Sequence, residues 1–140
     1  MTLRELHSGF IAEELEIDII EHNKDEIVVI STGHLYPLLE HPLAFSTFID
    51  TIISQSPDYV FFLGDLVFNN NNNEWDYILS KFNKIKAVKY FAPGNHDLNY
   101  HYERWNGIRE NQVDAEIKYI NNIGYRYKLV KDNFANYLFY

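Results

Sequence analysis

The sequence has no cysteine among its 140 residues, so disulfide bonds and thiolate metal ligands are excluded. It is also poor in basic residues: 12 Lys and Arg stand against 20 Asp and Glu, which gives a formal net charge of −8. Nucleic acids and anionic membranes select for basic patches, so we expect neither as the main partner. A bound cation could still create a local anion site in an acidic protein.

No apolar run approaches the roughly 18 residues of a membrane span. The first 26 residues also lack the basic stretch and apolar segment of a secretory signal. From these absences we expect a cytoplasmic protein. Apolar residues are abundant at 46%, with 2 Trp, 11 Tyr and 10 Phe. A chain of this length and composition is expected to bury roughly two-thirds of its unfolded surface as one domain.

Three apolar runs alternate with two helical patterns. The runs are "EIVVIS" (26–31), "DYVFFLGD" (58–65) and "AVKYFAPG" (87–94), and they lack the polar alternation of a strand with one solvated face. Between them, apolar residues recur at helical intervals over 43–55 and 74–85. The order strand–helix–strand–helix–strand predicts a parallel βαβαβ sheet whose strands are buried on both faces.

The two ends of the chain follow other patterns. Residues 113–124 are typical of a helix, and 125–130 and 136–140 of two strands around a polar turn. The secondary structure of residues 1–25 is not decided by the sequence, because a helical spacing and the strand-like alternation of "LEIDII" compete there. The main domain is therefore expected at 26–140. The asparagine tract 69–73 predicts a solvated loop, with a substrate-facing lip as the alternative.

Polar residues follow each of the three predicted strands. The first strand leads into His34, the second ends at Asp65 and the third ends at Asn95, at intervals of 31 and 30 residues. Because parallel strands end at the same edge of a sheet, these side chains are expected to lie together. Imidazole, carboxylate and amide oxygen suit a divalent metal. Each residue alone is more often a turn residue or a helix cap. Their common spacing favours one shared site.

The sequence around these residues resembles the calcineurin-like metallophosphoesterases over about residues 26–140. The resemblance rests on "GD" at 64–65 and "GNHD" at 94–97, each behind an apolar strand. The family's first motif, Asp-x-His, corresponds to "STGH" at 31–34. His34 is present there, but Thr32 stands where the family has aspartate.

The resemblance implies a four-layer α/β/β/α sandwich that holds two divalent metal ions, Mn, Fe or Zn, and hydrolyses a phosphate mono- or diester with metal-activated water. By this resemblance Asp65 bridges the two metals, His34 ligates the first and Asn95 the second. His96 contacts the phosphoryl group or protonates the leaving group, and Asp97 orients the ring of His96. The segment 113–140 resembles the start of the family's second sheet.

Two departures weaken the expected metal site. The hydroxyl of Thr32 is a poor ligand, and neither the later His nor the Gly-His-x-His motif of the family follows Asp97. We therefore expect incomplete metal occupancy and an inactive 140-residue chain. The aromatic "NYLFY" at 136–140 would leave an apolar edge. The chain is accordingly interpreted as the N-terminal part of a longer enzyme, whose remainder, or a partner, covers this last strand.

Two alternatives stay open from the sequence. The first is a pseudoenzyme retained to bind a phosphorylated ligand or a partner. The second is a flavodoxin-like binding module, for which "STGHLYP" after the first strand is a weak match. His41 and His101 are interpreted as ordinary surface or loop histidines, and His22 carries no signal. The class of phosphate ester is not specified by these residues.

Overall fold

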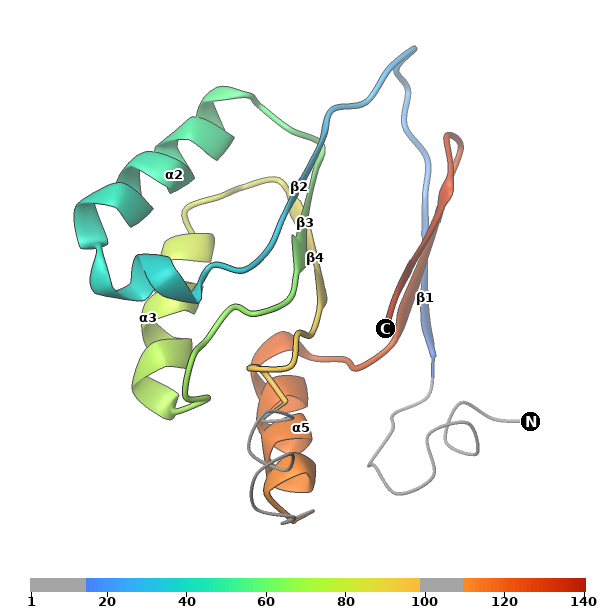
Figure 1. The fold of residues 1–140 in the computed structure, drawn as a ribbon. Coiled ribbons are helices and arrows are strands. Elements are labelled where there is room, and N and C mark those ends of the chain that lie inside the picture. Colours follow the sequence, from blue (N-terminus) through green and yellow to red (C-terminus); the bar gives the residue numbers. More distant parts are fainter. Residues whose placement is uncertain (1–14, 99–109) are drawn as a thin grey trace.

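The computed structural model describes residues 15–98 and 110–140, and the expectations for residues 1–14 and His101 fall outside these ranges. The described chain forms two three-stranded sheets that face each other (Figure 1). Two helices, α2 (Pro42–Ser54) and α3 (Asn72–Phe82), cover the other face of the first sheet. A third, α5 (Glu110–Ile123), lies at the end of the sheets. This mixed α/β architecture confirms the predicted fold class.

The first sheet contains β2 (Val29–Thr32), β3 (Tyr59–Leu63) and β4 (Val88–Ala92) in the order β2-β3-β4. All three strands are parallel, as the sequence predicts. Burial on both faces was expected for each strand, but only β3 is buried along most of its length. Because β2 and β4 are the edges of this sheet, Val29 and Val88 remain partly exposed.

The second sheet joins the two ends of the described chain. It contains β1 (Glu16–Ile20), β5 (Lys128–Asp132) and β6 (Asn136–Phe139) in the order β1-β5-β6. β1 runs parallel to β5, whereas β5 and β6 form an antiparallel hairpin. The segment whose pattern stayed open therefore contains a strand, and the expected start of a second sheet after the third helix is confirmed.

The outer face of the second sheet is apolar and exposed. Ile17 pairs with Leu129, which in turn pairs with Leu138, so their side chains share one face. Ile17, Ile19 and Leu138 are each more than half exposed. Within residues 15–98 and 110–140, the layers are thus helix, sheet and sheet, and no described helix covers this outer face.

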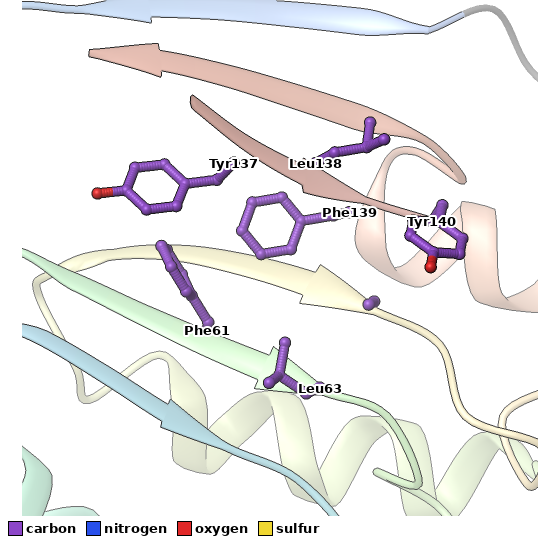
Figure 2. Close-up of a pocket in the computed structure, with 7 residues that line it drawn as sticks. Phe61, Leu63, Tyr137, Leu138, Phe139 and Tyr140 are labelled. Carbon is purple, nitrogen blue, oxygen red and sulfur yellow. The ribbon is translucent and has the colours of Figure 1, made fainter. Parts of the chain in front are cut away.

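Aromatic side chains fill the space between the two sheets. Phe61 of β3 lies with its ring centroid 5.0 Å from that of Tyr137 and 4.9 Å from that of Phe139, both on β6. Figure 2 shows Tyr137 and Phe139 pointing from β6 towards Phe61. Tyr90 of β4 stacks on Phe139 at 5.3 Å. Edge-to-face and offset ring pairs of this kind hold the sheets together. Beside them lies an apolar cavity of about 450 Å³.

The asparagine tract 69–73 is structural rather than a fully solvated loop. The side chain of Asn71 accepts a hydrogen bond from the N–H of Glu74, and the carboxylate of Glu74 accepts one from the N–H of Asn71. The two bonds form a capping box at the start of α3. Asn70 is buried, and its side chain accepts the indole N–H of Trp75. Lys118 of α5 donates to the carbonyl of Asn70 at 2.9 Å. The expectation of a solvated loop is therefore wrong for Asn70, whereas Asn69, Asn71, Asn72 and Asn73 are exposed.

A polar cluster links the two sheets near the beginning of β3. We call His22, Tyr59 and Asp132 the inter-sheet cluster. The Tyr59 hydroxyl donates to Asp132 Oδ2 at 2.9 Å and lies 2.7 Å from His22 Nε2. Asp132 Oδ1 also accepts the N–H groups of Phe134 and Ala135, each at 2.8 Å. The cluster ties the β1–β2 connection and β3 to the β5–β6 turn.

Burial and hydrogen bonding act in opposite directions on this cluster. Burial raises the pKa of the Asp132 carboxyl, but hydrogen bonds from the N–H groups of Ala135 and Phe134 and from Tyr59 outweigh it and lower the pKa below its ordinary value of 3.8. Burial, followed by the contact with Asp132, raises the pKa of Tyr59. Asp132 is therefore charged and Tyr59 neutral at neutral pH.

Every described helix, in residues 15–98 and 110–140, is too short or too polar to cross a membrane.

Candidate functional site

The turns after β3 and β4 pack against each other through two glycines. A Cβ on Gly94 would lie 2.2 Å from Asp65 Oδ1 and 2.3 Å from the Asp65 backbone nitrogen. A Cβ on Gly64 would lie 2.5 Å from the Gly94 nitrogen, and Gly64 has φ +86°. Only glycine fits at either position, because any side chain would overlap the backbone of the facing turn. The two glycines of the sequence motifs thus allow the strand ends to meet.

The turn after β2 is tied to the same place. The His34 N–H donates to the carbonyl of Gly64 at 2.8 Å, and the N–H groups of Leu35 and Tyr36 donate to the carbonyl of Asp65 at 2.8 and 3.1 Å. His34 and Asp65 both have positive φ, 59° and 54°. Left-handed backbone is uncommon for residues other than glycine and is often found at functional sites.

The carboxylate of Asp65 lies at the centre of the strand ends. Its Oδ2 is 3.2 Å from Nδ1 of His34, and its Oδ1 accepts the N–H of His96 at 3.2 Å. The side chain of His34 is 63% exposed and that of Asp65 is 19% exposed, so a ligand can reach both. The end of β3 therefore meets the ends of β2 and β4, as the sequence predicts. We call His34, Asp65, Asn95 and His96 the strand-end site.

Asn95 and Thr32 lie at the same edge of the sheet. Asn95 is exposed between Gly94 and His96, in the turn that follows β4. Thr32 is the last residue of β2, half-buried, and pairs with Phe62 of β3. Both residues therefore stand where β2 and β4 end, at the edge of the sheet that also carries Asp65.

Asp97 has a structural position that differs from the expected one. Its side chain is fully buried. Oδ1 accepts the N–H groups of Leu66 and Val67 at 2.8 and 3.1 Å, and Oδ2 accepts the N–H of Gly94 at 2.8 Å. The carboxylate therefore binds the turn after β3 to the turn after β4. Its role was expected to be orientation of the His96 ring, but its oxygens are used by buried backbone donors that have no other partner at the strand ends.

The environment of Asp97 perturbs its acidity. Burial raises the pKa of this carboxyl to about 6, although hydrogen bonds from the N–H groups of Gly94, Val67 and Leu66 favour the charged form. The negative charge of Asp65 adds to the increase.

The ring of His96 is held by other groups. Its Nδ1 lies 3.0 Å from the carbonyl oxygen of Phe68. Because a carbonyl can only accept, we assign the proton to Nδ1. The ring stacks on that of Phe68, with centroids 5.0 Å apart and planes at 26°, and lies 4.6 Å from that of Tyr36. The carbonyl and the ring of Phe68 therefore both help to orient His96.

Two aromatic residues of this region carry no motif signal in the sequence. Tyr36 and Phe68 both contact His96, and Tyr36 also lies 4.6 Å from the ring of His34. Tyr36 begins η1 (Tyr36–Glu40), a short 3-10 helix after β2. Their places shortly after His34 and after Asp65 are the only signal that could have found them, since residues just beyond parallel strands line the same edge.

The described donors at this edge make up only part of a two-metal site. His34 and Asp65 are in contact, and Asn95 follows β4 at the same edge of the sheet. Over residues 15–98 and 110–140, however, no group of three or more His, Cys, Asp or Glu side chains could hold a metal ion. Thr32 adds a neutral hydroxyl where a carboxylate would complete such a group. These residues therefore fit part of a two-metal site and not a whole one.

The model of the calcineurin-like phosphoesterase family matches residues 40–139. The chain belongs to this family. The match covers more than half of the chain and includes Gly64, Asp65 and the segment 94–97, but it begins after Thr32 and His34. The structure nevertheless brings His34 to Asp65. No curated protein matches the chain significantly. Family membership supports a phosphoesterase-type fold in place of the flavodoxin-like alternative, and members of this family generally bind divalent metals.

Proposed function

We propose that the strand-end site takes part in metal-dependent hydrolysis of a phosphate mono- or diester. The observation that carries the proposal is the position of the Asp65 carboxylate, which lies between Nδ1 of His34 and the N–H of His96. A partly exposed carboxylate next to an exposed imidazole at the carboxyl edge of a parallel sheet is a suitable place for a divalent cation and an anionic substrate.

In this proposal His34, Asp65 and Asn95 hold the cation. A bound divalent ion would neutralise phosphoryl charge and lower the pKa of a bound water. The metal is expected to be Mn, Fe or Zn, because an imidazole joins the oxygen ligands. Asp65 also fixes the turn after β4 through its contact with the His96 N–H, so cation and substrate residues keep one relative position.

His96 is proposed to contact the phosphoryl group. Its Nδ1 donates to the Phe68 carbonyl, which fixes the direction of the ring. A histidine beside the phosphoryl group can stabilise phosphoryl oxygens or give a proton to the leaving alkoxide. Stacking on Phe68 keeps the ring plane fixed during this exchange.

A second candidate function is binding of a phosphorylated ligand without turnover. Two observations favour it: Thr32 replaces a carboxylate, and the described residues lack a cluster of three or more metal-binding side chains of the types His, Cys, Asp and Glu. The two candidates share the same residues and differ in whether the cation is held strongly enough to activate water.

Calorimetric titration of the 140-residue chain with Mn²⁺ tests the proposal. We expect weak binding of about one ion, and we expect Asp65→Asn to abolish it. Asn adopts left-handed backbone readily and can still accept the N–H of His96, so this variant removes the charge with little change of structure. Asp50→Asn, which removes a carboxylate on the exposed surface of α2, is the matched control and should bind as the original chain does.

The variant Thr32→Asp separates the two candidates. It restores the missing carboxylate, and an added charged ligand should tighten Mn²⁺ binding by about tenfold or more. Turnover of bis(p-nitrophenyl) phosphate that appears together with tighter binding supports the phosphoesterase, whereas tighter binding with no turnover favours the non-catalytic candidate. Unchanged Mn²⁺ affinity in both Asp65→Asn and Thr32→Asp would contradict the metal site itself.

A further inference from the structure

A cavity adjoins the strand-end site on the side of η1. It has a volume of about 360 Å³, near the lower end of the roughly 300–1,000 Å³ of small-molecule pockets. Tyr36 and Phe68 line it, together with Leu39 and Glu40 of η1 and with His41. The site and the cavity therefore share Tyr36 and Phe68 as a common wall.

Four rings run without interruption from the strand-end site to the cavity. Tyr36 lies between His34 and His96, at 4.6 Å from the centroid of each. Phe68 stacks on His96 at 5.0 Å and lies 5.1 Å from Tyr36. A phosphoryl group that contacts His96 would thus have the rest of its molecule beside Tyr36 and Phe68.

The exposure of this wall favours a flat ligand. Phe68 is 45% exposed although the rings of His96 and Tyr36 contact it. Aromatic faces of this kind bind flat rings by stacking, and the interaction tolerates different rings. The side chain of Phe68 is held by His96 and Tyr36, so little conformational freedom is lost when a ring binds.

The charges around the cavity restrict the ligand further. Glu40 and Glu74 line it, and both carry carboxylates. Glu74 is already used in the contacts that cap α3, whereas Glu40 is exposed. Additional anionic groups would be repelled there, so the ring that enters is uncharged or basic. The single phosphoryl group stays at the strand-end site, next to His96.

We infer, on the basis of the proposed function, that the substrate is a phosphate ester with a flat, uncharged or basic aromatic ring, and that this ring stacks on Phe68 and Tyr36. Phosphate is recognised at the strand-end site, and the ring provides the specificity. A nucleoside monophosphate has this combination of groups and serves as the probe.

Three probes separate the ring from the phosphate: adenosine 5′-monophosphate, ribose 5-phosphate and adenosine. Each is titrated into the ¹⁵N-labelled 140-residue chain in the presence of Mg²⁺, which replaces paramagnetic Mn²⁺, and the amide shifts of residues 34–41 and 64–69 are followed. We expect adenosine 5′-monophosphate to bind about tenfold more tightly than ribose 5-phosphate, since stacking of one base has an effect of this order. The shifts should extend to Glu40 and His41 only for the two probes that contain the base.

Phe68→Leu removes the ring while it keeps an apolar side chain and the carbonyl that contacts His96. In this variant the two phosphates should bind equally. Phe134→Leu is the matched control, because Phe134 is similarly exposed, at 41%, but belongs to the β5–β6 turn. It should preserve the tenfold difference.

Equal binding of the two phosphates to the original chain would overturn the inference, and so would an unchanged difference in Phe68→Leu. Adenosine binding that depends on Phe68, together with no binding of ribose 5-phosphate, would support the ring pocket and contradict only the proposed phosphate site. Failure of the inference and failure of the proposed function therefore give different results.

Discussion

The two ends of β3 carry the same types of residue in opposite states. At its beginning, the side chain of Asp132 is fully buried and that of His22 is 13% exposed. Beyond its end, the side chain of Asp65 is 19% exposed and that of His34 is 63% exposed. Asp132 has donors for both of its oxygens from Tyr59 and the β5–β6 turn. A histidine–aspartate pair is therefore structural at one end and accessible to a ligand at the other.

The backbone differs between the two ends in the same sense. His34 and Asp65 have positive φ, whereas His22, Tyr59 and Asp132 do not. Left-handed backbone costs of order 1–3 kcal/mol at residues other than glycine and persists where the surrounding structure imposes it. At the strand-end site it is imposed by hydrogen bonds between the turns after β2 and β3. Two of the four described non-glycine residues with positive φ thus belong to the strand-end site, and the other two are Ser56, shortly before β3, and Asn70.

The largest effect is expected from Gly94→Ala. The added methyl group would lie 2.2 Å from Asp65 Oδ1 and 2.3 Å from its backbone nitrogen, so the turns after β3 and β4 must separate. We expect a loss of more than about 3 kcal/mol in the free energy of unfolding, measured by urea denaturation. Gly124→Ala is the control: its methyl group meets nothing within 4 Å, and φ of +100° alone should cost about 1 kcal/mol. Equal losses in the two variants would show that the turns are not in contact.

A smaller effect is expected when the two aspartates are compared directly. Asp132→Asn weakens hydrogen bonds to a buried charge and should lower the free energy of unfolding by about 2 kcal/mol. Asp65→Asn should change it by less than about 0.5 kcal/mol, because the side chain is partly exposed and Asn tolerates positive φ. Urea denaturation followed by circular dichroism measures both. Similar losses in the two variants would remove the distinction between a structural and a ligand-accessible end.

The smallest effect is expected in the pH dependence of the stability that Asp132 contributes. The pKa of Asp132 is lower in the folded chain than its ordinary value of 3.8. A depressed pKa contributes stability above the unfolded value, and this contribution is lost as the pH falls through the folded value. The stability difference between the original chain and Asp132→Asn should therefore be constant from pH 7 to about 5 and shrink below about 4. A difference that stayed constant down to pH 3 would mean that Asp132 is not held in its charged form.

The sequence predicted the first sheet and the meeting of its strand ends, because both depend on local signals. Apolar runs and helical spacing gave the three parallel strands, and the glycines at 64 and 94 marked the turns that meet. The positions of His34 and Asp65 followed from the parallel arrangement. The position of β1 beside β5 could not be predicted, because it depends on a pairing across 112 residues rather than on the pattern of 16–20 itself.

The misjudged residues share one physical cause. Asp97 was expected to serve the ring of His96, and the asparagine tract was expected to be solvated. Asp97 and Asn70 instead form hydrogen bonds with polar groups that become buried only when separate segments pack. Asp97 accepts three backbone N–H groups, and Asn70 accepts the indole N–H of Trp75. Sequence patterns show which residues are polar, but not which backbone groups the fold leaves without partners. Tyr36 and Phe68 were missed for another reason: no motif marks them, and only their places just beyond β2 and β3 indicate the site.

Paramagnetic NMR with Mn²⁺ tests the central claim most directly, because the ion broadens only nearby amide signals. One spectrum of the ¹⁵N-labelled chain reports both ends of β3. At substoichiometric Mn²⁺ we predict broadening at His34, Asp65 and His96, with Tyr59 and Asp132 unaffected, and we predict that Asp65→Asn removes the broadening. Broadening centred on the inter-sheet cluster would contradict a cation site at the strand ends. Broadening spread evenly over surface carboxylates, in the original chain and in Asp65→Asn alike, would contradict it too.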